Sequence, residues 1–151
     1  MPRTMAAHVR RHYSRYSSAN NHAIVEAAGV GIAAVIFGEQ AWLSESIALL
    51  EREVSRQTYA DGVNKEQALH YQLFVMEHVL KILGKAPSGL LVSRLRSMAD
   101  YARTCHVGGG RYIEFGDDDE GVILCLSSTK HSYPDYVLAF ASLEVGGDKR
   151  W

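Results

Sequence analysis

Hydrophobic residues recur every three or four positions over most of the first 105 residues, a period that is typical of amphipathic helices. The pattern predicts five helices, from about residue 18 or 20 to residue 37 and over residues 41–57, 65–83, 90–105 and 134–143. Gly38 and Gly84 directly follow two of these runs, where a helix commonly ends, and Pro134 suits the first turn of the last run. Helices joined by short loops predict antiparallel helical hairpins and a mainly α fold.

Three stretches add detail to this picture. Residues 27–34 are small and apolar on all sides, which predicts a helix buried between close neighbours. Asp61-Gly62 predicts a turn. Glycines at 108–110 and 116–121 punctuate two short apolar runs, so a short β or extended segment is expected near 111–126.

Composition narrows the class of protein. With 151 residues, 47% of them hydrophobic and 22% charged, the chain is expected to form one domain with a substantial core. A net charge of −1 argues against general nucleic-acid binding, which needs a strongly basic face. No apolar run approaches the roughly 20 residues that span a bilayer, and no apolar core of a signal peptide opens the chain. We therefore expect neither a nucleic-acid nor a membrane partner, and no cofactor or metal.

Positive charge is concentrated at the start of the chain. No acidic residue precedes Glu26, whereas residues 1–25 carry four arginines and three histidines. Such an arm is suited to an anionic polymer and also resembles a transit peptide; a solvated helix or a ragged terminus is the plainer alternative. We expect a basic arm (1–16), a helical domain (17–145) and a tail (146–151).

The run Asn20-Asn21-His22 is expected at the first turn of the buried helix. A helix N-terminus offers partial positive charge and free N–H groups, which favour a substrate carboxylate and leave a neutral His22 available as a base. Glu26, one turn later, is placed to orient the histidine ring. An alternative stays open, in which Asn20 caps the helix, His22 is a solvated residue and Tyr71 belongs to an apolar core stripe.

Two further patterns suggest other classes of protein. The segment from Gly29 to Ala34 matches G-x-G-x-x-A, a dinucleotide-binding fingerprint that requires a strand before it. The surrounding segments have helical periodicity, so a nucleotide-binding domain is only a third hypothesis. The acidic run at 117–120 is similar to a calcium loop but has Val122 where the EF-hand has glycine, so we interpret it as a polar turn.

Four short motifs follow one another along the chain: residues 20–29, reading N-N-H-x-x-x-E-A-A-G; Glu53 and Gln57 followed by Asp61-Gly62; Glu66-Gln67 with Tyr71; and residues 115–121, reading F-G-D-D-D-E-G. In this order they resemble the motifs of the heparinase II/III-like polysaccharide lyases. The resemblance covers about residues 17–121. It implies part of an incomplete alpha/alpha toroid, and a lyase that cleaves uronic-acid polysaccharide of the heparan sulfate, heparin or alginate kind by β-elimination.

The resemblance also implies roles for individual residues: Asn21, His22 and Tyr71 as catalytic residues; Asn20, Glu66, Gln67 and His70 as substrate-binding residues; and Glu26 and Asp117 as orienting residues. Asn21 would help to neutralise the uronate carboxylate, His22 would share in this or take the C5 proton, and Tyr71 would protonate the leaving O4. The physical chemistry agrees, because the C5 hydrogen becomes acidic only when the neighbouring carboxylate is neutralised.

The chain departs from the family pattern in two ways. The family has Ser-Pro before its tyrosine and His-Arg after it, whereas in this chain Ala68-Leu69-His70 precede Tyr71 and Gln72-Leu73 follow it. Five helices are also too few for the toroid, and the β-sandwich that normally follows is missing. We therefore expect either a fragment of a lyase, with little activity alone, or a non-catalytic helical module that binds carbohydrate or protein. Exposed apolar helix faces would favour self-association, and family members are periplasmic or secreted.

Overall fold

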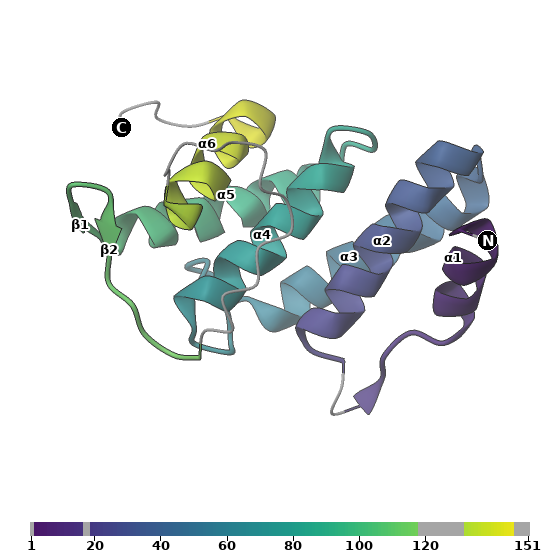
Figure 1. The fold of residues 1–151 in the computed structure, drawn as a ribbon, viewed down its shortest axis with the longest axis horizontal. Coiled ribbons are helices and arrows are strands. Elements are labelled where there is room, and N and C mark those ends of the chain that lie inside the picture. Colours follow the sequence, from purple (N-terminus) through teal and green to yellow (C-terminus); the bar gives the residue numbers. More distant parts are fainter. Residues whose placement is uncertain (1, 17–18, 118–131, 147–151) are drawn as a thin grey trace.

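The computed structural model describes residues 2–16, 19–117 and 132–146. It is mainly helical, as predicted, with one small antiparallel sheet (Figure 1). The elements, in chain order, are α1 (Pro2–Arg11), α2 (Asn21–Phe37), α3 (Gln40–Gln57), α4 (Leu69–Leu83), α5 (Gly89–Thr104), β1 (His106–Gly108), β2 (Arg111–Tyr112) and α6 (Tyr133–Val145).

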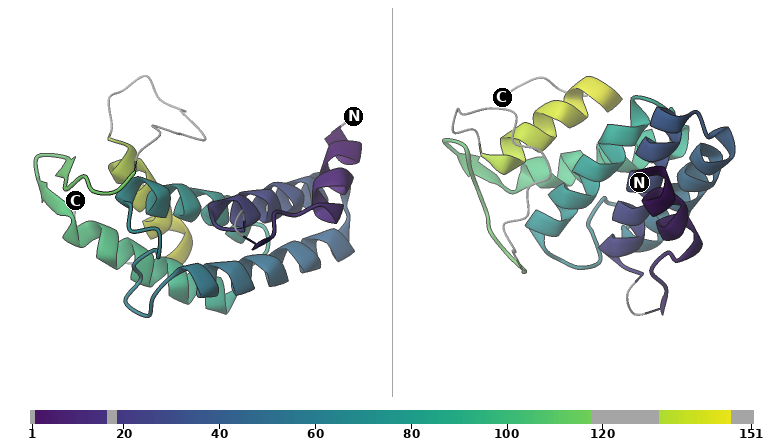
Figure 2. Two further views of the ribbon diagram at one scale, coloured as in Figure 1. Left: turned by 90° about the horizontal axis from the view of Figure 1, so that it is seen from below. Right: turned by 45° about the vertical axis from the view of Figure 1, so that its right-hand side comes forward.

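The helices form two antiparallel hairpins in two layers. Helices α2 and α3 form the first hairpin and α4 and α5 the second, and Figure 2 shows α2 and α4 in one layer and α3 and α5 in the other. Helix α6 packs on both α4 and α5, whereas α1 packs on α2. Helices α2 and α4 begin at the same end of the molecule (Figure 1), so their partial positive charges point the same way.

Most of the small residues of α2 are buried between its neighbours, as predicted, although Gly29 is exposed. A Cβ atom at Gly31 would lie 3.1 Å from Ile82 Cδ1 of α4 and 3.3 Å from Ser46 Cβ of α3. Gly38 ends α2 in the left-handed conformation, with φ of 71°. Because Gly29 to Ala34 lie inside this continuous helix, with no strand before them in residues 2–16 and 19–28, the dinucleotide-binding hypothesis is wrong.

The start of α4 was predicted four residues too early. Residues 65–68 belong to a turn, because Asn64 Oδ1 accepts a hydrogen bond from Glu66 N at 2.9 Å and Gln67 has a φ of +54°. Asparagine side chains compete with the helix for backbone N–H groups in this way. The other predicted helix boundaries agree with the structure to within two residues, apart from the start of the first helix, at Asn21.

The basic segment at the start of the chain is a helix, α1, in which no residue is buried. This agrees with the solvated-helix alternative. Arg3 pairs with Glu39, and Arg10 Nη2 donates to Glu45 Oε1 at 2.7 Å. Both guanidinium groups also lie over the ring of Trp42.

The extended segment begins earlier than expected. Strands β1 and β2 pair antiparallel, with His106 opposite Tyr112, and Gly109 and Gly110 both have positive φ in the turn between them. Residues 118–126 of the predicted segment, and most of the acidic run, lie outside the described residues.

Surface properties bear on two further expectations. In the described ranges, no helix has the length and apolar character needed to cross a membrane. Val35, Ile36 and Phe37 are exposed at the end of α2, and the side chain of Ile36 is 70% accessible. Self-association through such faces stays a prediction.

Candidate functional site

The loop between α3 and α4 folds back beside the start of α2. Thr58 and Asn64 form an isolated antiparallel bridge, and Lys65 N donates to Gln57 O at 2.8 Å. The predicted turn at Asp61-Gly62 is confirmed. Gly62 is buried with φ of +92°, and a Cβ there would lie 2.2 Å from Ser97 O of α5, so only glycine fits this position without a shift of backbone.

Gln57 ties the end of α3 to the residues that precede α2. Its Nε2 atom donates to Asn20 O at 2.9 Å and to Ala19 O at 3.2 Å. The same atom lies 3.2 Å from Glu53 Oε2, one helical turn earlier. The E-x-x-x-Q motif therefore holds the Asn20-Asn21-His22 motif in place through the backbone.

Glu53 is a buried carboxylate on this face of α3. Arg56 Nε donates to its Oε2 at 2.9 Å, and Arg52 Nε donates to its Oε1 at 3.2 Å. Burial by itself raises the pKa of Glu53, but the hydrogen bonds from the arginines and from Gln57 outweigh burial and hold that pKa below its usual value. Glu53 therefore stays ionised at neutral pH.

Asn64 anchors the loop to α4 and α5. Its backbone N–H donates to Gln72 Oε1 at 3.1 Å, and Gln72 Nε2 donates to Met98 O at 2.8 Å. Neither Asn64 nor Gln72 belongs to the motifs that predicted the site. A glutamine on an otherwise apolar helical stripe was the available signal, because a buried amide needs fixed hydrogen-bond partners.

The motifs converge on the start of α2 and the start of α4. Glu66 Oε1 lies 3.5 Å from Asn21 N, at the open end of α2. On the other side of this turn, Phe115 O accepts a hydrogen bond from Leu69 N at 3.3 Å, and a Cβ at Gly116 would lie 2.5 Å from Gln67 O. The F-G-D segment thus packs directly on the Glu66-Gln67 segment.

A polar pocket of about 260 Å³ lies at this convergence, and its lining residues are Asn20, Arg56, Gln57, Asn64, Lys65 and Glu66. Two of them carry a buried polar atom without a hydrogen-bond partner in the described structure, namely the acceptor Gln57 Oε1 and the donor Asn64 Nδ2. Buried polar atoms without a partner are rare in proteins. Both atoms have almost no accessible surface, so a ligand would reach them only if the wall of the pocket moved.

Asn20 lines the pocket and directly precedes α2. It occupies the N-cap position of α2 but makes no side-chain capping hydrogen bond, so this part of the alternative is wrong, whereas its expectation of a solvated His22 agrees with the structure. Lys65 extends from the loop, where its ammonium group donates to Arg56 O and lies 5.4 Å from the centre of the Tyr59 ring. The pocket thus combines amide groups, two cations and one carboxylate, which suits an oxygen-rich ligand with negative charge.

His22 and Glu26 lie on the first turns of α2 but outside the pocket lining. His22 is exposed. Glu26 accepts hydrogen bonds from Ser14 N at 2.6 Å and Ser14 Oγ at 2.7 Å, so its carboxylate holds the segment between α1 and α2. Orientation of the His22 ring by Glu26 stays a prediction.

His70 and Tyr71 lie on the first turn of α4, half-buried and also outside the pocket lining. The His70 ring lies 5.1 Å from the ring of Tyr133 on α6 and 6.4 Å from the ring of Tyr71. Gln67 and Asp117 are exposed near this end of α4. The structure therefore brings Asn20, Asn21 and Glu66 together and places the other candidates on neighbouring turns. Among the described side chains, no cluster of three or more histidines, cysteines and acids is arranged to hold a metal ion.

Comparison with known proteins agrees with the motif pattern. A family described as Heparinase II/III N-terminus matches residues 3–106, a range that also includes α1. Searches of curated proteins and of solved structures gave no match. Because the family match spans well over half of the chain, the protein belongs to the heparinase II/III family of polysaccharide lyases.

Proposed function

We propose that this protein acts on uronic-acid polysaccharide as a β-eliminating lyase, with the start of α2 and the start of α4 as its catalytic end. The convergence of four motifs around one polar pocket supports this most directly. Residues 20–21 meet Gln57 and Glu66, and the Gly116 backbone packs on Gln67. Segments that are far apart in the chain contribute polar groups to one end of the helical layers.

In the proposed reaction, Asn21 donates hydrogen bonds to the uronate carboxylate, aided by the positive end of α2. His22 takes the C5 proton, and the C5–H electron pair becomes the C4–C5 double bond. The C4–O4 bond breaks, and Tyr71 gives its proton to the departing O4. Asn20, Glu66, Gln67 and His70 hold neighbouring sugars, and Asp117 orients this end of α4.

The test is the ultraviolet absorbance of the unsaturated uronide product, measured with heparin, heparan sulfate and alginate. His22→Ala and Tyr71→Phe are each expected to lower kcat by roughly 10²-fold or more, because each removes an acid–base group. The matched controls are His106→Ala, at an exposed histidine of β1, and Tyr59→Phe, at an exposed tyrosine. Because a fragment of a lyase would have little activity alone, the lyase would be excluded by absence of product on all three polymers both from this chain and from any longer protein that contains it.

A second candidate is a carbohydrate-binding module without catalysis. One observation favours it, because neither His22 nor Tyr71 lines the pocket that contains Asn20 and Glu66. In that case no product forms, His22→Ala and Tyr71→Phe leave oligosaccharide affinity unchanged, and Asn20→Ala weakens it. Isothermal titration calorimetry with the same polymers distinguishes the two functions.

A further inference from the structure

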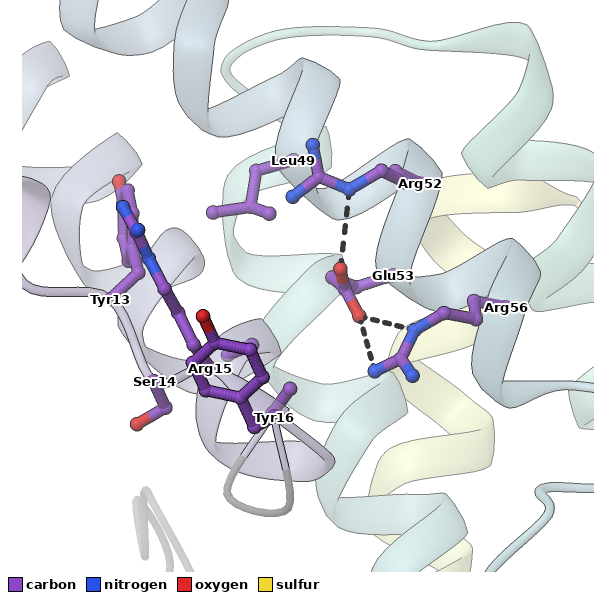
Figure 3. Close-up of a pocket in the computed structure, with 10 residues that line it drawn as sticks. Tyr13, Ser14, Arg15, Tyr16, Leu49, Arg52, Glu53 and Arg56 are labelled. Atoms are coloured by element: carbon purple, nitrogen blue, oxygen red, sulfur yellow. Dashed lines mark hydrogen bonds and ion pairs between the residues drawn. The ribbon is translucent and has the colours of Figure 1, made fainter.

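A second and larger pocket, of about 410 Å³, lies between α3 and the segment that joins α1 to α2. Figure 3 shows residues 13–16 on one side of it and Leu49, Arg52, Glu53 and Arg56 of α3 on the other. Arg56 lines this pocket and also the pocket at Asn20. The two pockets are therefore neighbours on either side of one arginine.

Positive charge exceeds negative charge in this pocket. Arg15, Arg52 and Arg56 contribute three guanidinium groups, and Glu53 is the one carboxylate among the lining residues. Glu53 engages Arg52 through Nε alone, so both terminal nitrogens of Arg52 stay available. In the described ranges, the Arg15 guanidinium has neither an ion-pair nor a hydrogen-bond partner. Guanidinium groups bind sulfate and carboxylate through paired N–H donors.

An aromatic ring at the edge of the pocket is held in an unfavourable backbone conformation. Tyr16 has φ of +57°, which is uncommon for a bulky residue, and its side chain is 93% exposed. Packing does not explain this arrangement, since the ring buries almost no surface. Backbone strain of this kind is associated with ligand sites, and a tyrosine ring offers a flat face on which a sugar ring can stack.

We propose that this pocket binds the anionic group of an acidic sugar, as a subsite next to the pocket at Asn20. Arg15 and Arg52 bind the sulfate or carboxylate, and Tyr16 stacks on the sugar ring. Because Arg56 borders both pockets, successive sugars of one polysaccharide chain occupy them together. This inference rests on the proposed function for the identity of the polymer, but the arginine pocket itself is independent of catalysis.

The test is calorimetric titration of the full chain with two oligosaccharides of equal length, one derived from heparin and one an unsulfated oligouronate. Arg15→Gln and Arg52→Gln are each expected to weaken binding about tenfold, the effect of one lost charge-assisted hydrogen bond. Arg111→Gln on β2 is the matched control, because it removes the same charge from the opposite end of the molecule (Figure 1). A larger effect with the heparin oligosaccharide identifies sulfate as the preferred group, and equal effects identify carboxylate.

Tyr16→Asn tests the ring separately. Asparagine tolerates positive φ better than other non-glycine residues, so this variant removes the ring without adding strain. We expect weaker binding by about tenfold with an unchanged or higher Tm. Unchanged affinity in Arg15→Gln, Arg52→Gln and Tyr16→Asn, each folded by thermal unfolding, would overturn the subsite.

The two proposals fail in different ways. If the lyase proposal is wrong, no unsaturated product forms, yet the arginine variants still lose affinity. If the subsite is wrong, the arginine variants bind oligosaccharide like Arg111→Gln, whether or not unsaturated product forms.

Discussion

Two regions attach the first part of the chain to the helical hairpins, one through exposed ion pairs and the other through buried hydrogen bonds. Helix α1 is held by surface ion pairs from Arg3 and Arg10, and it buries no residue. The start of α2 is held by hydrogen bonds from side chains such as Gln57, only 6% exposed. Exposed ion pairs contribute little because water and salt screen them, whereas buried hydrogen bonds are costly to break. The proposed site therefore lies at the start of α2, the attachment that is held by buried hydrogen bonds.

The largest effect is expected where the backbone of the loop meets α5. In Gly62→Ala the new Cβ would lie 2.2 Å from Ser97 O, at a φ of +92°, so we expect a loss of about 3 kcal/mol of unfolding free energy. Gly29→Ala is the matched control, because nothing lies within 4 Å of its Cβ position on the exposed side of α2. It should stabilise the protein by about 0.5–1 kcal/mol, and urea unfolding measures both. Equal unfolding free energies for Gly62→Ala and Gly29→Ala would show that the loop can move away from α5.

Loss of the Gln57 side chain comes next in size. Gln57→Leu leaves two backbone carbonyls, Ala19 O and Asn20 O, without their donor, which costs about 2 kcal/mol. The control is Gln40→Leu on the exposed start of α3, expected within about 0.5 kcal/mol of the parent. Hydrogen exchange at the first amides of α2 should accelerate in Gln57→Leu alone. Unchanged protection there would contradict the rigid attachment of the site.

The buried carboxylate of Glu53 makes the free energy of unfolding depend on pH. The folded pKa of Glu53 lies below the unfolded value of 4.5, so its contribution is present above that value and is lost as the pH falls through the folded pKa. Glu53→Gln should cost about 1 kcal/mol at neutral pH and flatten the stability profile below pH 4.5. The pKa of Glu45 is also lowered, by Arg10, but this pair is exposed, so Glu45→Gln should change the profile less. A larger change of the pH profile in Glu45→Gln than in Glu53→Gln would contradict the difference between the two regions.

The smallest effect on stability is expected at α1. The double variant Arg3→Gln, Arg10→Gln removes the ion pairs and the two guanidinium groups over Trp42, and we expect almost no change in Tm because exposed ion pairs contribute little to stability. Release of α1 should nevertheless expose Trp42. Acrylamide quenching in a Trp151→Phe background, where Trp42 is the one remaining tryptophan, should rise in the double variant and also in the parent at high salt. Quenching that is independent of salt would mean that α1 is held by contacts other than charge.

Hydrophobic periodicity correctly predicted the helices that pack through their own apolar stripe. It identified α2 to α6, because their buried residues recur at helical spacing. It gave no helix over α1, which the sequence offered only as a solvated-helix alternative and which pairs with the distant acids Glu39 and Glu45. It also began α4 too early, since the turn at Gln67 is set by the hydrogen bonds of Asn64.

The candidate site was predictable in its residues but not in its arrangement. Motif order pointed to Asn20, Asn21 and Glu66, which the structure places together. Asn64 and Lys65 were missed, because neither belongs to a recognisable spacing. The arginine pocket was also missed, since it joins residues 15 and 16 to Arg52 and Arg56 across the fold.

The sequence by itself determined the helical character, the helix ends at glycine and the membership of a lyase family, because these depend on local spacing and on motif order. Only the tertiary structure decided that Gln57 supports the backbone at Asn20 and that Gly116 packs on Gln67. Contacts between distant segments depend on how the hairpins pack, and no local period encodes that packing.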